Sequence, residues 1–298
     1  MVKVKEIASG IYWLEVRLSF AGPSYFTVYF IKESPGALIE PGPASLIPEI
    51  QEAMKQLGMK DLAYIIPTHI HVDHAGAIGK LAQLFPEAKV VVHPAGVKHV
   101  VDPSRLIEST KTVFGDDFHT ALGAILPVPE SQLKVPEDGE IIKVGSRELQ
   151  IILAPGHAPH HLAILDRKEN GLFCGEALGL MSGGDKPVVL PAVAPPGFDQ
   201  GLYLETMEKL SKLKANKLFY SHDGIGLEPE KLISMVAENT RYLGDFILQA
   251  LKAGETPDDI CSSLKKEAKS RFGLELTDND VAMTVGGYTV YFRKKGLV

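Results

Sequence analysis

Four metal-binding side chains lie within six residues, in the stretch His69-Ile70-His71-Val72-Asp73-His74. The apolar run before it, residues 63–67, ends at a proline and predicts a buried strand, and residues 76–84 after it have helical spacing. The cluster is therefore expected on a strand-to-helix loop, where the backbone can bend several side chains around one ion. Neutral imidazole and carboxylate ligands suit Zn²⁺, and also Fe or Mn. We therefore predict a metal site at this loop.

Three later loops carry further metal-binding side chains, each behind a predicted strand. Residues 149–153 lead into Pro155-Gly156-His157-Ala158-Pro159-His160-His161, and residues 171–175 lead into Glu176. Residues 218–220 lead into His222. In the third motif an apolar strand ends in Gly-Glu, which predicts that the carboxylate emerges at the edge of a sheet.

The first motif, His-x-His-x-Asp-His after a buried strand, resembles the signature of the metallo-β-lactamase superfamily. The later motifs follow in the family's order, and the resemblance covers roughly residues 7–228. It implies an α/β fold, a four-layer αββα sandwich, with one or two metal ions at the edge of the paired sheets.

The resemblance also implies a role for each metal-binding residue. One ion is expected on His69, His71 and His157 and a second on Asp73, His74 and His222, with Glu176 between them. The family usually has aspartate where this chain has Glu176, so whether this longer carboxylate bridges, binds one ion or stays back is open. Asp73 is also the catalytic candidate, because it could steer the attacking water or take its proton. Three residues are predicted to contact and orient the metal ligands without binding an ion themselves, namely Glu40, Thr68 and His161. His160 has no assigned role and is predicted to be solvated.

A metal hydrolase is the function that this resemblance implies, within a glyoxalase II-like subgroup. A metal-bound hydroxide would attack a small ester, thioester or lactone. The Lys–Asn-Pro-Phe pattern that binds glutathione in hydroxyacylglutathione hydrolases is not apparent in the C-terminal helices, which weakens that assignment. Three alternatives stay open: iron-dependent sulfur or oxygen chemistry similar to that of persulfide dioxygenases, a phosphodiesterase, and a non-enzymatic metal-binding module.

Charge and composition narrow the expected partners. The formal charge is −6, which argues against broad binding of nucleic acid and favours a small-molecule substrate. No apolar run has the length of a membrane span, and residues 1–6 are not followed by an apolar segment of signal-peptide length. Two separated cysteines, Cys174 and Cys261, predict no disulfide framework, so a cytoplasmic location is expected. A buried, inert role is predicted for Cys174, and a homo-oligomer is left open.

Two domains are predicted, a catalytic domain over residues 1–228 and a helical domain over residues 229–298. Helices are expected over 229–253 and from the start signals Thr256-Pro257-Asp258-Asp259 and Thr277-Asp278-Asn279-Asp280. A winged-helix DNA reader is the alternative, but acidic and basic residues nearly balance in this segment, which disfavours binding of nucleic acid. Near the N-terminus, residues 21–24 are predicted to form a turn between two strands.

Overall fold

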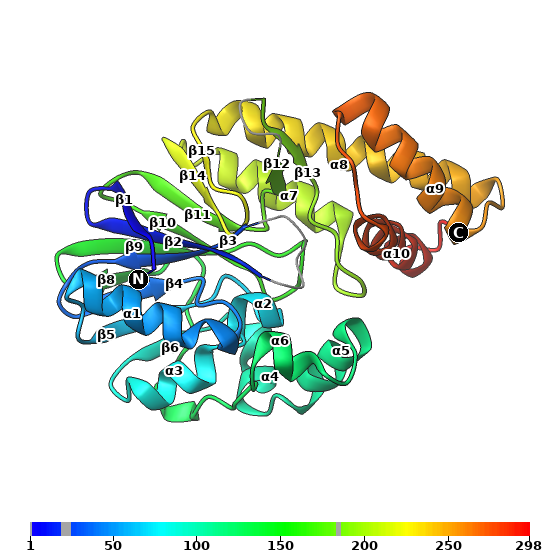
Figure 1. Cartoon of the computed structure of the whole chain (residues 1–298). Helices are drawn as coiled ribbons and strands as arrows, with labels where there is room; N and C mark the ends of the chain where they lie inside the picture. The colour runs from blue at the N-terminus through cyan, green and yellow to red at the C-terminus, as the bar shows by residue number, and fades with distance from the viewer. Residues whose placement is uncertain (1, 19–24, 183–185) are drawn as a thin grey trace. The chain divides into compact units, whose positions relative to one another are not determined.

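The computed structural model describes residues 2–18, 25–182 and 186–298 (Figure 1). The turn predicted at residues 21–24 lies outside the described residues. Contacts divide the chain into two compact units. The first unit comprises Met1–Leu153, His160–Gly175 and Ala215–Ile225, and the second comprises Ala154–Pro159, Glu176–Lys214 and Gly226–Val298. The predicted mixed α/β fold with C-terminal helices is confirmed.

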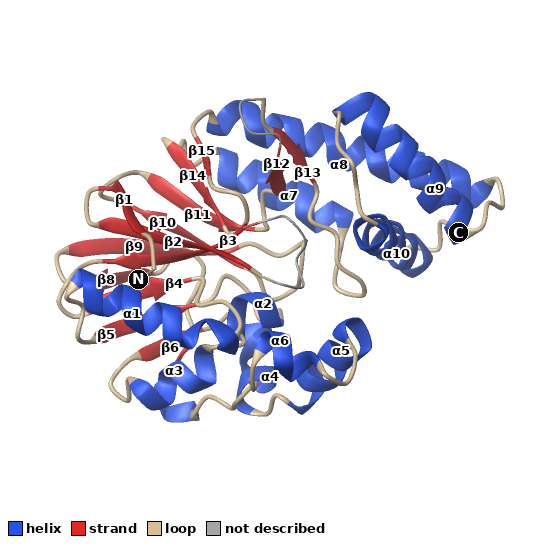
Figure 2. Cartoon of the chain, viewed as in Figure 1, coloured by secondary structure: helices blue, strands red, loops and turns tan. Residues whose placement is uncertain are grey.

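Two sheets form the first unit (Figure 2). The seven-stranded sheet has the order β1-β2-β3-β4-β5-β6-β7, antiparallel from β1 to β4 and parallel from β4 to β7. Its strands are β1 (Val4–Ala8), β2 (Ile11–Arg17), β3 (Tyr25–Ile31), β4 (Gly36–Ile39), β5 (Leu62–Ile66), β6 (Lys89–Val91) and β7 (Leu133–Lys134). The six-stranded sheet has the order β15-β14-β11-β10-β9-β8, with β11 and β14 parallel. Its strands are β8 (Ile141–Val144), β9 (Arg147–Leu153), β10 (Leu162–Asp166), β11 (Gly171–Gly175), β14 (Lys217–Tyr220) and β15 (Ile225–Gly226).

Helices of the first unit connect the parallel strands. They are α1 (Ile47–Leu57), α2 (Val72–Ala75), α3 (Ile78–Leu84), α4 (Val97–Val101), α5 (Ser104–Phe114) and α6 (Phe118–Leu122), with single 3₁₀ turns at Ala44–Leu46, Pro94–Gly96 and Glu130–Gln132. Helix α1 ends at Leu57, because Gly58 takes the left-handed conformation with φ 70°.

Side chains alternate between the two faces of the seven-stranded sheet, and each face of the sheet borders an apolar core. Successive side chains of a strand point to opposite faces, so Phe30 and Tyr29 of β3 enter different cores. Phe30 joins the cluster that includes Ile50 of α1 and Leu81 of α3. Tyr29 joins the cluster between the two sheets, in which Phe173 packs against it. Both faces of the seven-stranded sheet are therefore buried, which holds its strand ends in fixed positions.

The second unit consists mainly of helices, namely α7 (Gln200–Ser211), α8 (Pro229–Lys252), α9 (Pro257–Glu267) and α10 (Asp278–Lys294), with a π-helical turn at Ala268–Phe272. A small hairpin of β12 (Leu180–Ser182) and β13 (Val188–Leu190) completes it. Both predicted helix starts are confirmed, because Thr256 and Thr277 form capping boxes with Asp259 and Asp280.

The C-terminal segment contains no DNA-reading wing. Residues 229–298, all of them described, form helices and no strand. A Cβ on Gly287 of α10 would come 2.3 Å from Val193, so this glycine allows the two to pack closely. None of the helices described is both long and apolar enough to cross a membrane.

Candidate metal centre

The first motif follows β5, the strand that lies between β4 and β6 in the parallel half of the seven-stranded sheet. His71, the residue before α2 (Val72–Ala75), has an extended backbone with φ −61° and ψ 148°. The backbone N–H of His74 donates to the carbonyl of His71 at 3.0 Å, and the N–H of Gly42 donates to the carbonyl of His74 at 3.1 Å. The loop prediction thus needs a correction, because Asp73 and His74 lie on a short helix that starts inside the motif.

Asp73, His74 and His222 come together within the first unit. One ligand atom from each can be chosen so that all three lie within 4.8 Å of one another. Asp73 Oδ2 is 3.4 Å from His74 Nε2 and 3.9 Å from His222 Nε2. Phe26 of β3 packs its ring edge-on against both imidazoles, at centroid distances of 5.3 and 5.4 Å. This apolar contact limits how far either imidazole can turn.

Glu40 and Thr68 lie behind the motif. Glu40 is 1% exposed, and its backbone has the left-handed φ of 55°, which is uncommon for a residue other than glycine. Its Oε2 is 3.1 Å from His74 Nδ1, and its Oε1 accepts a 2.6 Å hydrogen bond from the hydroxyl of Thr68. The same hydroxyl lies 3.1 Å from His69 Nδ1. One buried carboxylate thus contacts His74 directly and His69 through Thr68.

Hydrogen bonds fix three histidines in the same tautomer. The Glu40 carboxylate can only accept, so His74 Nδ1 carries a hydrogen, and the Thr68 hydroxyl already donates to Glu40, so it accepts from His69 Nδ1. His157 Nδ1 donates to the carbonyl of Ala192 at 2.9 Å. In the neutral form each of these rings carries its lone pair on Nε2, as a histidine oriented for metal binding does.

Four histidines pack closely in the first unit. His69 Nε2 is 2.9 Å from His71 Nδ1. The buried ring of His161 stacks on His69 with 4.9 Å between centroids. His160, predicted to be solvated, is instead half-buried, and its Nδ1 is 3.4 Å from the backbone nitrogen of Ile70. It contacts the backbone between His69 and His71, so it belongs to the surroundings of the motif.

His157 and Glu176 form a pair within the second unit. His157 Nε2 lies 2.8 Å from Glu176 Oε2, and both residues are less than 10% exposed. Gly156, with φ 139°, precedes His157, and a Cβ at Gly156 would overlap the backbone of Tyr203 on α7. The Pro-Gly-His sequence is therefore required for the close approach of this loop to α7.

Two carboxylates make the surroundings of His74 strongly negative. Burial lowers the pKa of its imidazole, but Asp73 and Glu40 outweigh burial and raise this pKa well above 6.5. A negative potential that favours an imidazolium also favours a divalent cation. Cys174 on β11 differs, because burial raises the pKa of its thiol well above 9.0, and its Sγ donates to the carbonyl of Phe219. The buried location predicted for Cys174 is confirmed, and its neutral thiol is a poor metal ligand.

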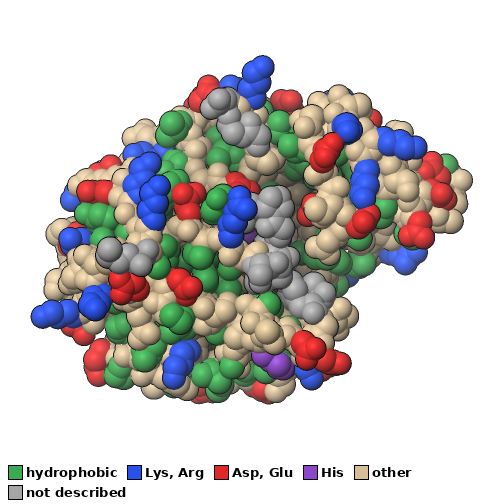
Figure 3. All heavy atoms as spheres, in the orientation of Figure 1, with side chains coloured by type: hydrophobic (Ala, Val, Ile, Leu, Met, Phe, Trp, Pro, Cys, Tyr) green, Lys and Arg blue, Asp and Glu red, His purple; other side chains and the backbone are tan. Residues whose placement is uncertain are grey.

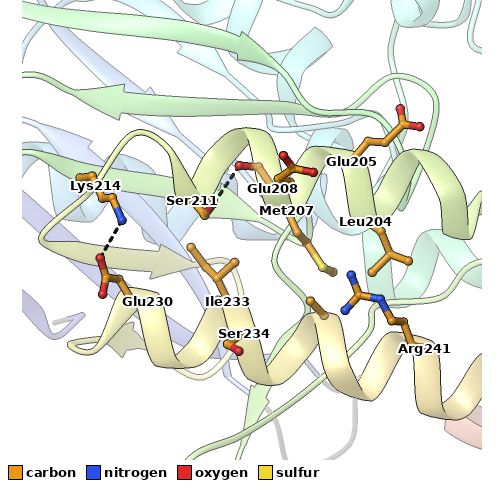
Figure 4. Close-up of a pocket in the computed structure, with 11 residues that line it drawn as sticks. Leu204, Glu205, Met207, Glu208, Ser211, Lys214, Glu230, Ile233, Ser234 and Arg241 are labelled. Carbon is orange, nitrogen blue, oxygen red and sulfur yellow. Dashed lines mark hydrogen bonds and ion pairs between the residues drawn. The ribbon is translucent and has the colours of Figure 1, made fainter.

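A cavity of about 430 Å³ lies between α7 and α8 of the second unit (Figure 4). Its lining includes Arg241, and at one end Lys214 and Glu230 form an ion pair at 2.9 Å. None of the candidate metal ligands lines this cavity. The chemistry is therefore assigned to the histidines and carboxylates rather than to this cavity.

Two groups that contact the candidate ligands were not predicted. Ala192 acts through its backbone carbonyl, and Tyr203 donates its hydroxyl hydrogen to the carbonyl of Glu176 at 2.7 Å. Every residue has a backbone carbonyl, so the contact made by Ala192 could not be predicted from the type of its side chain. The one signal in the sequence is the high proline content of residues 191–198, the segment that contains Ala192.

Comparison with known proteins identifies the family. Residues 21–222 match the model of the metallo-beta-lactamase superfamily. The metallo-beta-lactamase fold-containing protein ST1585 of Sulfurisphaera tokodaii is 30% identical over 167 residues, which are 55% of this chain and 61% of that protein. Its crystal structure matches with a TM-score of 0.61 at 26% identity, over 73% of this chain and 80% of that one.

Two further relatives agree. The probable metallo-hydrolase MJ0888 of Methanocaldococcus jannaschii is 28% identical over 150 residues, or 50% of this chain and 66% of that protein. The metallo-beta-lactamase family protein TTHA1429 of Thermus thermophilus shares the fold, with a TM-score of 0.73 at 20% identity over 98% of this chain and 95% of that one. The chain spans between 53% and 61% of the length of the first three curated relatives that it matches. It belongs to the metallo-beta-lactamase superfamily.

Proposed function

We propose that the chain is a metal-dependent hydrolase of small esters, thioesters or lactones, and that it uses two divalent ions. Zinc is the first candidate, with iron and manganese as alternatives, because imidazole and carboxylate ligands suit all three. The observation that carries the proposal is the common tautomer of His69, His74 and His157, each fixed through Nδ1 by a protein acceptor. Each ring then offers the lone pair of its Nε2 to a cation.

The order of ligands in the family supports the assignment of each residue. We assign the first ion to His69, His71 and His157 and the second to Asp73, His74 and His222, with Glu176 contributing between them. The donor set fits a divalent cation, because it combines imidazoles with carboxylates and does not include the protonated thiol of Cys174. Glu40, Thr68 and His161 are assigned to support, and the contacts of Glu40 and Thr68 support that role.

The chemistry divides between the ions and the protein. Bound divalent ions would lower the pKa of a water and polarise the carbonyl of a substrate. Asp73 is suited to orient that water or to hold its proton, because its side chain is 26% exposed while the neighbouring His74 is fully buried. Phe26 contributes by restraining the imidazoles of His74 and His222.

Surface charge supports a small substrate over a polymer. On the face drawn in Figure 3, lysines and arginines are dispersed among aspartates and glutamates and do not merge into one broad basic surface. Together with the net charge of −6, this disfavours substrates that carry many phosphates. The order of its motifs is the basis on which we place the chain in a glyoxalase II-like subgroup. The glutathione-binding pattern of hydroxyacylglutathione hydrolases is not apparent in its C-terminal helices.

The test is an activity panel on purified, metal-reconstituted protein. Nitrophenyl esters and lactones should be hydrolysed, activity should disappear with chelator and return with metal, and Asp73→Ala should remove it while the protein stays folded by circular dichroism. His99→Ala, at a histidine of α4 outside the site, is the control that should keep activity.

Other outcomes would replace the proposal. Cleavage of bis-nitrophenyl phosphate without esterase activity would point to a phosphodiesterase, and iron-dependent oxygen consumption with a persulfide would point to oxidative chemistry. Metal binding without turnover of any of these compounds would favour a binding module.

A further inference from the structure

Tyr203 of α7 is a fully buried tyrosine whose hydroxyl connects two segments of the second unit. The hydroxyl donates to the carbonyl of Glu176 at 2.7 Å and accepts from the backbone N–H of Ala192 at 3.2 Å. Both capacities of the phenol are therefore used by the backbone. Such a group holds two chain segments at a fixed separation.

Both segments carry or contact a candidate metal ligand. The carbonyl of Ala192 accepts from His157 Nδ1 at 2.9 Å, while Glu176 Oε2 lies 2.8 Å from His157 Nε2. The contacts form a closed ring that runs from the hydroxyl of Tyr203 through Glu176, His157 and Ala192 back to the same hydroxyl. We call these four residues the Tyr203 network. Each ligand of the pair is thus fixed relative to the other through the tyrosine.

Helix α7 anchors the tyrosine itself. The backbone N–H of Asp199, the N-cap of α7, donates to the carbonyl of Gly156 at 2.9 Å. Thr206 Oγ1 donates to the carbonyl of Pro155 at 2.6 Å. The residues before His157 are therefore held by the same helix turns that carry Tyr203. The hydroxyl of Tyr203 consequently has little freedom to move relative to His157.

We propose that Tyr203 is a positioning residue that holds His157 and Glu176 in register as ligands of one metal ion. The proposal rests on the proposed function, and it adds a residue to which no role had been assigned. A glutamate has one more rotatable bond than the aspartate usual in the family, so its carboxylate is less restrained by its own side chain. The hydrogen bond to the carbonyl of Glu176 fixes the backbone from which that side chain extends.

The test compares two tyrosine-to-phenylalanine variants of the full chain. Tyr203→Phe removes the hydroxyl of the network. Tyr288→Phe on α10 is the matched control, because Tyr288 is also fully buried in the second unit and also donates to a backbone carbonyl, that of Thr240, at 2.7 Å. Zinc affinity is measured by competition with a chromophoric chelator, and ligand geometry by the visible absorption of the Co²⁺-loaded proteins.

Tyr203→Phe should bind zinc about 10- to 100-fold more weakly than the parent chain and should alter the cobalt spectrum, as is typical when a group that orients a ligand is removed. Tyr288→Phe should keep the parent's affinity and spectrum, although both variants lose a phenol–carbonyl hydrogen bond. If Tyr203→Phe does not fold, 3,5-difluorotyrosine at position 203 makes the hydroxyl a stronger donor and a weaker acceptor, and it should alter the cobalt spectrum, whereas 3,5-difluorotyrosine at position 288 should not.

Equal zinc affinity and unchanged cobalt spectra in both variants would overturn the role of Tyr203. A parent chain that binds none of zinc, iron and manganese would overturn the proposed function instead, so the two failures are distinguishable.

Discussion

Replacing Gly175 by alanine should displace Thr68 and His161, two residues that contact the candidate metal ligands. Gly175 is the last residue of β11 and has φ 53°, a left-handed conformation that costs an L-residue about 1–2 kcal/mol. A Cβ built there would lie 2.5 Å from Thr68 Oγ1 and 2.7 Å from His161 Nε2. Both distances fall well short of an ordinary contact, and neither neighbour can turn into solvent because both are fully buried.

Overpacking of this kind costs about 1–3 kcal/mol. Together with the left-handed backbone, Gly175→Ala should lower the free energy of unfolding by roughly 2–5 kcal/mol. Gly58→Ala is the matched control, because Gly58 is also left-handed, with φ 70°, but a Cβ there meets nothing within 4 Å. It should cost about 1–2 kcal/mol, the backbone contribution alone. The gain from a stiffer unfolded chain is common to both variants and cancels in the comparison.

The assay is urea unfolding of chelator-treated protein, followed by the fluorescence of Trp13. Trp13 is the single tryptophan and lies in the same unit as both glycines, so it reports the unit that is perturbed. Zinc affinity should fall with stability in Gly175→Ala, because Thr68 must move away from His69 and Glu40. If Gly175→Ala proves no more destabilising than Gly58→Ala, the steric reasoning is refuted.

Three further predictions concern other parts of the chain. Arg147→Ala leaves the fully buried Asp166 without its 2.6 Å partner and should cost about 3–5 kcal/mol, whereas Arg167→Ala, in an exposed pair, should cost less than about 1 kcal/mol in the same unfolding assay. Burial raises the pKa of Asp166. An acid whose pKa is raised by folding favours the folded state when protonated, so the deficit of Arg147→Ala should shrink as the pH falls through that pKa and should persist at neutral pH. Finally, a thiol reagent should label Cys261 in the native protein but Cys174 only after unfolding, because the latter is fully buried; rapid native labelling of both thiols would contradict this.

Sequence alone predicted the fold at the positions where a local signal was strong. The start signals at Thr256 and Thr277 predicted two helix starts, and both form capping boxes in the structure. The short helix α2 was missed, because its four residues carry side chains selected for chemistry and show no apolar period. The strands β12 and β13 were also missed, since strands of three residues carry little pattern.

The candidate site was partly predictable for a related reason. The chemistry of imidazole and carboxylate is visible in residue types, so His69, Asp73 and Glu176 could be named from their motifs. Orientation is not visible in this way, because it depends on backbone carbonyls such as that of Ala192 and on the hydroxyl of Tyr203. His160 was predicted to be solvated because three adjacent imidazoles cannot all reach one ion, yet in the structure it packs beside the motif.

The central claim is that this chain binds divalent ions through the named histidines and carboxylates, and zinc stoichiometry tests it most directly. The purified chain and its His222→Ala and His99→Ala variants are reconstituted, freed of excess metal and analysed by inductively coupled plasma mass spectrometry. The parent and His99→Ala should hold about two equivalents, and His222→Ala should lose about one of them. A parent chain that holds no metal after reconstitution, or a His222→Ala variant that keeps the full stoichiometry, would contradict the account.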